Sequence, residues 1–223
     1  MLLPVPSLIW QVFDGFGATL FADFYQTFVS SAIPGFIMGS GTGFLVAIAA
    51  DKIPFLRRGL IPIGNFFSAI PIIGMAPIMI MWFGFDWQSK AAVVAIMTFF
   101  PMLVNTLVGL NETDKIDRDL LHTYATNYWR ELLSLRLPNA MPFILNALKI
   151  NSTLAMIGAI VAEFFGTPIV GMGFRISAEV DRMNIDMLWA TIAIAALTGS
   201  IFYGVFALLE IQLTFCHPSM RKS

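Results

Sequence analysis

Five side chains between residues 149 and 163 recur at steps of three and four in an otherwise apolar run. They are Lys149, Ser152, Met156, Ala159 and Glu163. In an α-helix this spacing places all five on one face. Charged side chains on an apolar helix normally face the protein interior or water. The face is therefore predicted to line a path for a polar molecule. The alternative is a helix–helix contact whose two charges lie at the helix ends, within reach of water.

A second polar group lies in the apolar run that begins near residue 60. Asn65 and Ser68 stand among prolines at positions 62, 71 and 77. Proline removes a helical hydrogen bond, and inside a membrane the freed carbonyl is tolerated only where protein or a cavity surrounds it. We predict a kinked helix that turns Asn65 and Ser68 toward protein or the polar path. A plain kink without such a role is the alternative.

The other reactive side chains form no catalytic or metal-binding set. His122 and His217 lie far apart, with no neighbouring Ser, Cys or carboxylate pair, and the single Cys216 excludes an internal disulfide. The glycine-rich segment 39–43 has no preceding strand and no following Gly-Lys-Ser/Thr, so a phosphate-binding loop is not expected. The net charge of −1 does not bear on nucleic-acid binding, and no basic patch suggests it. We predict a non-enzyme without a cofactor of its own.

The helices that carry these residues are predicted from the runs of sequence that contain no charged residue. Hydrophobic residues make up 57% of the 223 residues and charged residues 12%. No Asp, Glu, Lys or Arg occurs in 24–50, 59–85, 91–111, 150–162 or 187–209. Most of these runs reach the roughly 20 residues that cross a bilayer core, and the shorter one does so with 139–148 added. We predict an all-α polytopic membrane protein with five spans, near 27–49, 60–82, 91–110, 141–162 and 187–210.

Residues 1–26 are predicted to form a separate external segment. Asp14 and Asp23 lie there among aromatic residues, a composition that suits an interfacial amphipathic helix. The chain is then either a five-span protein or a sequence that begins late. Residues 27–210 form the transmembrane domain, and 211–223 form a tail.

The loop charges predict the orientation. Segments 50–59, 111–140 and 211–223 share one side of the five-span arrangement and carry nine Lys and Arg residues. The opposite side carries Lys90, Arg175 and Arg182. By the positive-inside rule the long loop and the C-terminus are cytoplasmic.

Gly35, Gly39 and Gly43 repeat every four residues in the first predicted span. This spacing puts them on one face, where the missing Cβ atoms let a neighbouring helix approach closely. We predict that this face packs against another span.

Residues 119–138 form a polar, helix-prone island between apolar runs. Aromatic side chains bury much area at interfaces with few rotatable bonds, and leucines at helical spacing suit docking into a groove of another polypeptide. The predicted anchors are Leu121, Tyr124, Tyr128, Trp129, Leu132 and Leu135.

This island resembles the cytoplasmic coupling loop of permeases of binding-protein-dependent ABC importers. The family pattern is Glu-Ala-Ala, three residues, Gly, nine residues, Ile-x-Leu-Pro. Here Asp119 begins the motif, Ala125 stands for the glycine, and the spacing from Ala125 to Pro138 is intact. The resemblance implies a coupling loop over 111–140, with Asp119, Ala125 and Pro138 added to the anchors.

Two further segments resemble the branch of this family that imports nitrate, taurine, alkanesulfonates and pyrimidine precursors. One runs from Pro71 to Lys90 and continues to Phe99-Phe100-Pro101. The other is Val161-Ala162-Glu163-Phe164 followed by Gly171-Met172-Gly173. With the loop, these segments cover most of residues 30–210.

The resemblance implies a five-span permease core in the cell (inner) membrane that passes a small polar solute inward. Two permease subunits, expected to be a homodimer, would join two cytoplasmic ATPase subunits, which bind ATP and Mg²⁺, and an external or periplasmic solute-binding protein. A secondary transporter or channel subunit is the alternative, but it should show mid-span ion sites or repeated halves. An intramembrane enzyme should show a catalytic set within the spans. Neither alternative explains the loop.

Overall fold

The structure is a computed structural model that describes residues 6–53, 55–56, 59, 72–123, 126–166 and 169–214. Within these ranges the chain is helical, without a β-strand, as the all-α prediction requires. Asn65, Ser68, Tyr124 and Ala125 lie outside the described residues.

The first span is a long, continuous helical stretch. It consists of α1 (Pro6–Phe24), the π-helix η1 (Tyr25–Ala32) and α2 (Ile33–Lys52). Non-helical backbone angles at Phe16 mark a kink near its start. The predicted boundary at residue 26 therefore falls inside a helix, and Asp23 is buried rather than solvated.

The remaining helices follow in the order expected from the apolar runs. They are α4 (Ile72–Phe83), α5 (Trp87–Asn111), α6 (Lys115–Thr123), α7 (Tyr128–Glu131), the π-helix η2 (Leu132–Arg136), α8 (Leu137–Glu163), α9 (Met172–Asp181) and α10 (Ile185–Thr214). Four stretches of the described chain are long and apolar enough to cross a membrane: 10–52, 87–111, 128–163 and 185–213. The predicted second span lies mostly outside the described residues, so the count of five spans stays a prediction.

The core is built on α5, which packs against α2 on one side and α8 on the other. The three glycines of α2 lie at this contact: a Cβ at Gly35 would be 2.5 Å from the Val94 Cβ, and one at Gly43 would be 2.5 Å from the Phe99 carbonyl oxygen. A Cβ at Gly39 would overlap the Thr98 hydroxyl and the Ala95 backbone. Only glycine at these positions lets the two backbones come so close.

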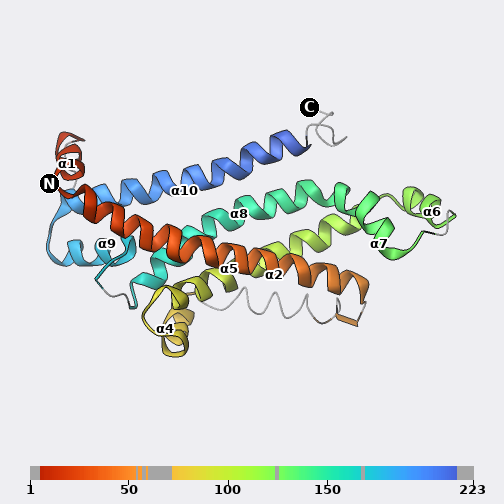
Figure 1. Cartoon of the computed structure of the whole chain (residues 1–223), viewed down its shortest axis with the longest axis horizontal. Helices are drawn as coiled ribbons and strands as arrows, with labels where there is room; N and C mark the ends of the chain where they lie inside the picture. Colours follow the sequence, from red (N-terminus) through yellow and green to blue (C-terminus); the bar gives the residue numbers. More distant parts are fainter. Residues whose placement is uncertain are drawn as a thin grey trace.

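The long helices run side by side, so the molecule has two ends (Figure 1). One end carries α6, α7 and the end of α2, and α10 runs toward it. The opposite end carries the start of the chain and α9. Helix α10 covers α8 with one face and leaves its other apolar side chains exposed, as expected of a helix in lipid.

Candidate functional site

The segment between α5 and α8 folds as a compact helical cap on one end of the bundle. Short helices α6 and α7 lead into η2, which runs directly into α8. The Asn127 side chain caps α7 by accepting a hydrogen bond from the Arg130 amide at 3.0 Å. Arg118 on α6 pairs with Glu131 on α7 at 3.4 Å. These contacts hold α6 and α7 together as one unit, here called the coupling segment, residues 115–136.

A buried ion pair ties the coupling segment to the end of α2. Two nitrogens of the Arg136 guanidinium contact the two Asp51 carboxylate oxygens at 2.7 and 2.5 Å. The third, Nε, donates to the Leu110 carbonyl oxygen at 3.1 Å. The Tyr128 hydroxyl donates to Asp51 at 2.9 Å. A bidentate pair with its remaining groups satisfied fixes both position and orientation.

Asp51 is not among the residues predicted from the sequence, although its position there indicates a paired charge. It is an acidic residue directly after a run without charge, and Arg136 stands at the start of another apolar helix. Charges at such places are costly unless they are paired.

The structure corrects the prediction that Leu132 is a docking anchor. Leu132 is 1% exposed and packs in a core cluster with Leu110, Ala140 and Ile144. The next residue, Leu133, is 62% exposed. Both are leucines of equal hydrophobicity, so the pattern alone did not indicate which one faces outward; the packing of η2 against Leu110 and Ile144 decides it.

The other predicted anchors that the structure describes are exposed or half-buried. Trp129 is 50% exposed, and the Lys52 ammonium lies 5.1 Å from its ring centroid. Leu121, Tyr128 and Leu135 are half-buried, whereas Asp119 and Pro138 are exposed. Two exposed apolar side chains, Ile116 and Leu120 on α6, are absent from the predicted set.

The polar face of α8 lies inside the subunit. Ser152, Met156 and Ala159 are buried, the last two in a core cluster with Phe36 and Val94. This placement matches the helix–helix alternative, because these side chains fill the space between helices; of the three, Met156 also borders the open groove described below. The charges at the two ends are also paired rather than solvated. Lys149 contacts Glu210 of α10 at 2.5 Å, and Glu163 is 2% exposed.

The expectation that Glu163 reaches water is therefore wrong. Its carboxylate accepts a hydrogen bond from the Thr27 hydroxyl at 2.9 Å and one from the Gly173 amide at 2.8 Å. The reason lies in the tertiary structure, because η1 and α9 cover the end of α8. The residue pattern of a single span does not reveal such a contact.

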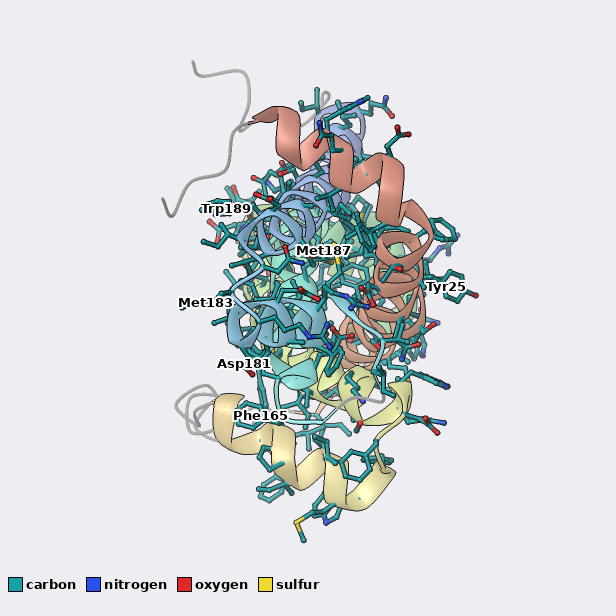
Figure 2. All side chains as sticks on the ribbon, turned by 90° about the vertical axis from the view of Figure 1, so that its left-hand side faces the viewer. Tyr25, Phe165, Asp181, Met183, Met187 and Trp189 are labelled. Atoms are coloured by element: carbon teal, nitrogen blue, oxygen red, sulfur yellow. The ribbon has the colours of Figure 1, made fainter. Side chains whose placement is uncertain are left out.

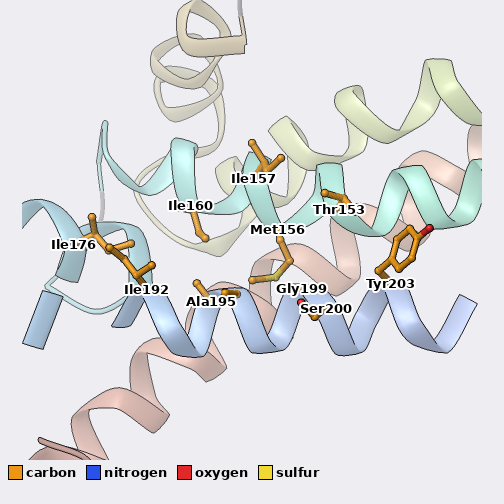
Figure 3. A pocket seen from close by; sticks show the side chains of 11 residues that line it. Thr153, Met156, Ile157, Ile160, Ile176, Ile192, Ala195, Gly199, Ser200 and Tyr203 are labelled. Atoms are coloured by element: carbon orange, nitrogen blue, oxygen red, sulfur yellow. The ribbon is translucent and has the colours of Figure 1, made fainter. Parts of the chain in front are cut away.

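An open apolar groove runs beside this face, between α8 and α10 (Figure 3). Its volume is about 600 Å³, and hydroxyls of Thr153, Ser200 and Tyr203 lie on its otherwise apolar wall. Of the predicted polar face, Met156 borders it. Gly199 also lines the groove, and a Cβ there would lie 3.7 Å from Met156, an ordinary contact distance, so an alanine would fit at this position.

Asn151 is a buried polar residue that the sequence patterns do not single out. Its amide nitrogen donates to the Ser40 hydroxyl at 2.9 Å and to the Thr98 carbonyl at 2.7 Å. It thus joins α2, α5 and α8 at mid-span by hydrogen bonds that hold these helices in register.

The described chain is an all-α bundle with helices long and apolar enough to cross a membrane and a helical cap at one end, the class of a polytopic membrane protein. The model of the family described as "Binding-protein-dependent transport system inner membrane component" matches residues 39–215. The chain belongs to this family of ABC importer permeases, which are transport subunits of the membrane and not enzymes.

Individual relatives place the chain in the branch indicated by the sequence. It is 28% identical over 213 residues to the riboflavin transport system permease protein of Chloroflexus aurantiacus, covering 94% of this chain and 78% of the relative. It is 29% identical over 210 residues to the formylaminopyrimidine transport permease protein of Halalkalibacterium halodurans, covering 94% and 83%. It is 27% identical over 236 residues to the putative aliphatic sulfonates transport permease protein of Bacillus subtilis, covering 96% and 85%.

Among solved structures, the chain is similar to an inward-facing methionine ABC transporter. The TM-score is 0.66 at 17% identity, and the match covers 95% of this chain and 100% of that chain. At this identity the similarity supports the fold. Membership of the family means that the permease works with an ATPase and a solute-binding protein.

Proposed function

We propose that the coupling segment docks onto a cytoplasmic ABC ATPase and transmits its movement to the spans. The observation that carries this proposal is the exposed apolar surface of Ile116, Leu120, Trp129 and Leu133 on a cap beyond the spanning helices. Exposed apolar side chains gathered on a polar segment indicate a protein partner. The segment would provide the apolar part of a helix-in-groove contact.

The buried pair of Asp51 and Arg136 suits the transmission of force. A movement of α7 and η2 would pull directly on α2 through the bonds of Tyr128 and Arg136 to Asp51, and on α8 through the continuous helix that begins at η2. Energetic coupling between distant sites travels through such packed and hydrogen-bonded elements.

The rest of the assembly is part of the same proposal. The ATPase subunits bind ATP and Mg²⁺, and this chain binds neither. Two copies of the permease form a homodimer, the C-terminus is cytoplasmic, and a small polar solute is received from the external binding protein. The differing solutes in the relatives' names do not choose one for this chain.

Two adjacent leucines provide the test. Leu133→Asp places a charge on the proposed docking surface, at a desolvation cost of roughly a few kcal/mol, which weakens an interface on the order of a hundredfold. We expect normal permease abundance and loss of the ATPase during co-purification. Leu132→Asp, the matched variant, places the charge in the core and should reduce the abundance of the permease itself.

The outcomes separate cleanly. A Leu133→Asp permease that retains its ATPase at the unmodified level contradicts the docking surface. An abundance unchanged by Leu132→Asp would contradict the core position of that residue.

A further inference from the structure

The N-terminus of α9 is capped by three side chains that belong to other helices. The amides of Gly171, Met172 and Gly173 donate in turn to the Asp23 carboxylate at 2.8 Å, the Thr27 hydroxyl at 2.7 Å and the Glu163 carboxylate at 2.8 Å. The first amides of a helix have no partner within it. Here they are satisfied by the first span and by α8, and the three side chains are called the clamp.

The clamp residues are also bonded to one another and to α9. The Thr27 hydroxyl lies 2.9 Å from Glu163, and Nε of Arg175 on α9 lies 2.7 Å from Asp23. Asp23, Thr27 and Glu163 are buried. Because a buried carboxylate is strongly unfavourable when it loses its partners, releasing α9 would be costly: Asp23 would lose the Gly171 amide and Arg175, and Glu163 would lose the Gly173 amide.

Glycines allow the close approach. Gly171 has φ +141°, and a Cβ there would lie 2.7 Å from the Glu163 carboxyl carbon. A Cβ at Gly173 would overlap the Ile160 carbonyl oxygen. The backbone of α9 therefore sits directly on the clamp, with no space for a side chain between them.

We propose that Asp23, Thr27 and Glu163 are positioning residues that fix α9 to the first span and to α8, so that all three elements move as one rigid body during transport. An importer must change the arrangement of its helices to expose its path to each side in turn. The clamp restricts which helices can separate at this end: α9 cannot act as a gate on its own. This inference concerns the end opposite the coupling segment and does not depend on the docking surface.

A disulfide across the clamp tests the rigid body. The 2.7 Å contact between the Thr27 hydroxyl and the Met172 amide limits the distance between their Cα atoms to about 6.6 Å, which a disulfide can span. Thr27→Cys with Met172→Cys, in a Cys216→Ser permease assembled with its ATPase and binding protein, should import at the same rate oxidised and reduced. Import that stops on oxidation and returns with reductant would overturn the proposal.

Spin labels measure the same movement with the clamp intact. Tyr25 on the first span and Asp181 on α9 are exposed on opposite sides of this end (Figure 2). A permease labelled at both positions would be diluted with unlabelled permease, so that the distance within one chain is recorded. We expect one distance in the nucleotide-free complex and in the complex trapped with ATP and vanadate, and two different distances would overturn the rigid body.

Clamp variants in the labelled permease separate positioning from general stability. Asp23→Ala removes the acceptor of the Gly171 amide and should make the label distance depend on nucleotide. Asp23→Asn keeps an oxygen acceptor and should restore the single distance. An Asp23→Ala permease with the unmodified single distance would show that the clamp does not hold α9. If the permease with Thr27→Cys and Met172→Cys does not assemble, the label distances alone test whether α9 moves with the first span.

Discussion

At the scale of single residues, Asp51 is the side chain on which the coupling segment depends most. It accepts hydrogen bonds from Arg136 and Tyr128, and its side chain is almost fully enclosed. Breaking a buried ion pair by removing one partner costs more than replacing both partners with apolar groups, because the remaining charge is left unpaired.

We therefore expect Asp51→Ala to lower the free energy of unfolding by about 3–5 kcal/mol, as a buried and unpaired Arg136 would. Thermal unfolding of the detergent-solubilised permease is the measurement. The double variant Asp51→Leu with Arg136→Met should recover part of the loss. A single variant as stable as the unmodified protein would mean that the pair is not enclosed.

The difference between Leu132 and Leu133 shows what a sequence pattern can and cannot predict at this scale. The aromatic and leucine content of 119–138 predicts a docking surface, but the exposed leucine is set by the contact of η2 with Leu110 and Ile144. Glu163 shows the same limit, because its partners Thr27 and Gly173 lie on other helices, 136 and 10 residues away along the chain. Side-chain partners across helices cannot be read from the periodicity of one helix.

At the scale of elements, the contact between α2 and α5 depends on glycine. Gly35, Gly39 and Gly43 all face α5, whereas Gly41 faces away with nothing within 4 Å of its would-be Cβ. The two kinds of glycine in one helix therefore differ in the cost of an added methyl group.

Gly39→Ala should push α2 from α5, because the new Cβ would overlap the Thr98 hydroxyl and the Ala95 backbone. Overpacking of this kind costs about 1–3 kcal/mol. Gly41→Ala, the matched control, should leave the melting temperature unchanged or raise it, since alanine favours a helix. Equal melting temperatures for the two variants would contradict the close contact.

The elements themselves were largely predictable because charge is excluded from lipid. The run without charge at 91–111 predicts α5, and the run at 187–209 predicts most of α10. The π-helix η1 was not predictable in this way. Its buried Thr27 and Ser31 satisfy tertiary and local partners, and hydropathy does not register such bonds.

At the scale of the whole molecule, the helix bundle connects two polar ends. The coupling segment is held at one end by Asp51 and Arg136, and α9 is held at the other by the clamp. Between them, Asn151 joins three helices at mid-span. We therefore expect a movement at the first end to be carried to the second by the packed helices.

The orientation of the two ends is expected to follow the positive-inside rule. In a Cys216→Ser background, a cysteine at Asp117 on α6 should be shielded from a membrane-impermeant thiol reagent in intact cells, and one at Ser177 on α9 should react. Both positions are exposed, so burial does not confound the comparison. Labelling at Asp117 without labelling at Ser177 would reverse the orientation.

The most direct test of the central claim is the ATPase activity of the reconstituted complex. The unmodified permease, assembled with its ATPase and binding protein in liposomes, should hydrolyse ATP faster when solute-loaded binding protein is present. A permease with Trp129→Asp and Leu133→Asp should insert normally yet lose both this stimulation and solute uptake, because its docking surface is charged. Stimulated ATP hydrolysis and uptake at the unmodified rates in that double variant would contradict the account.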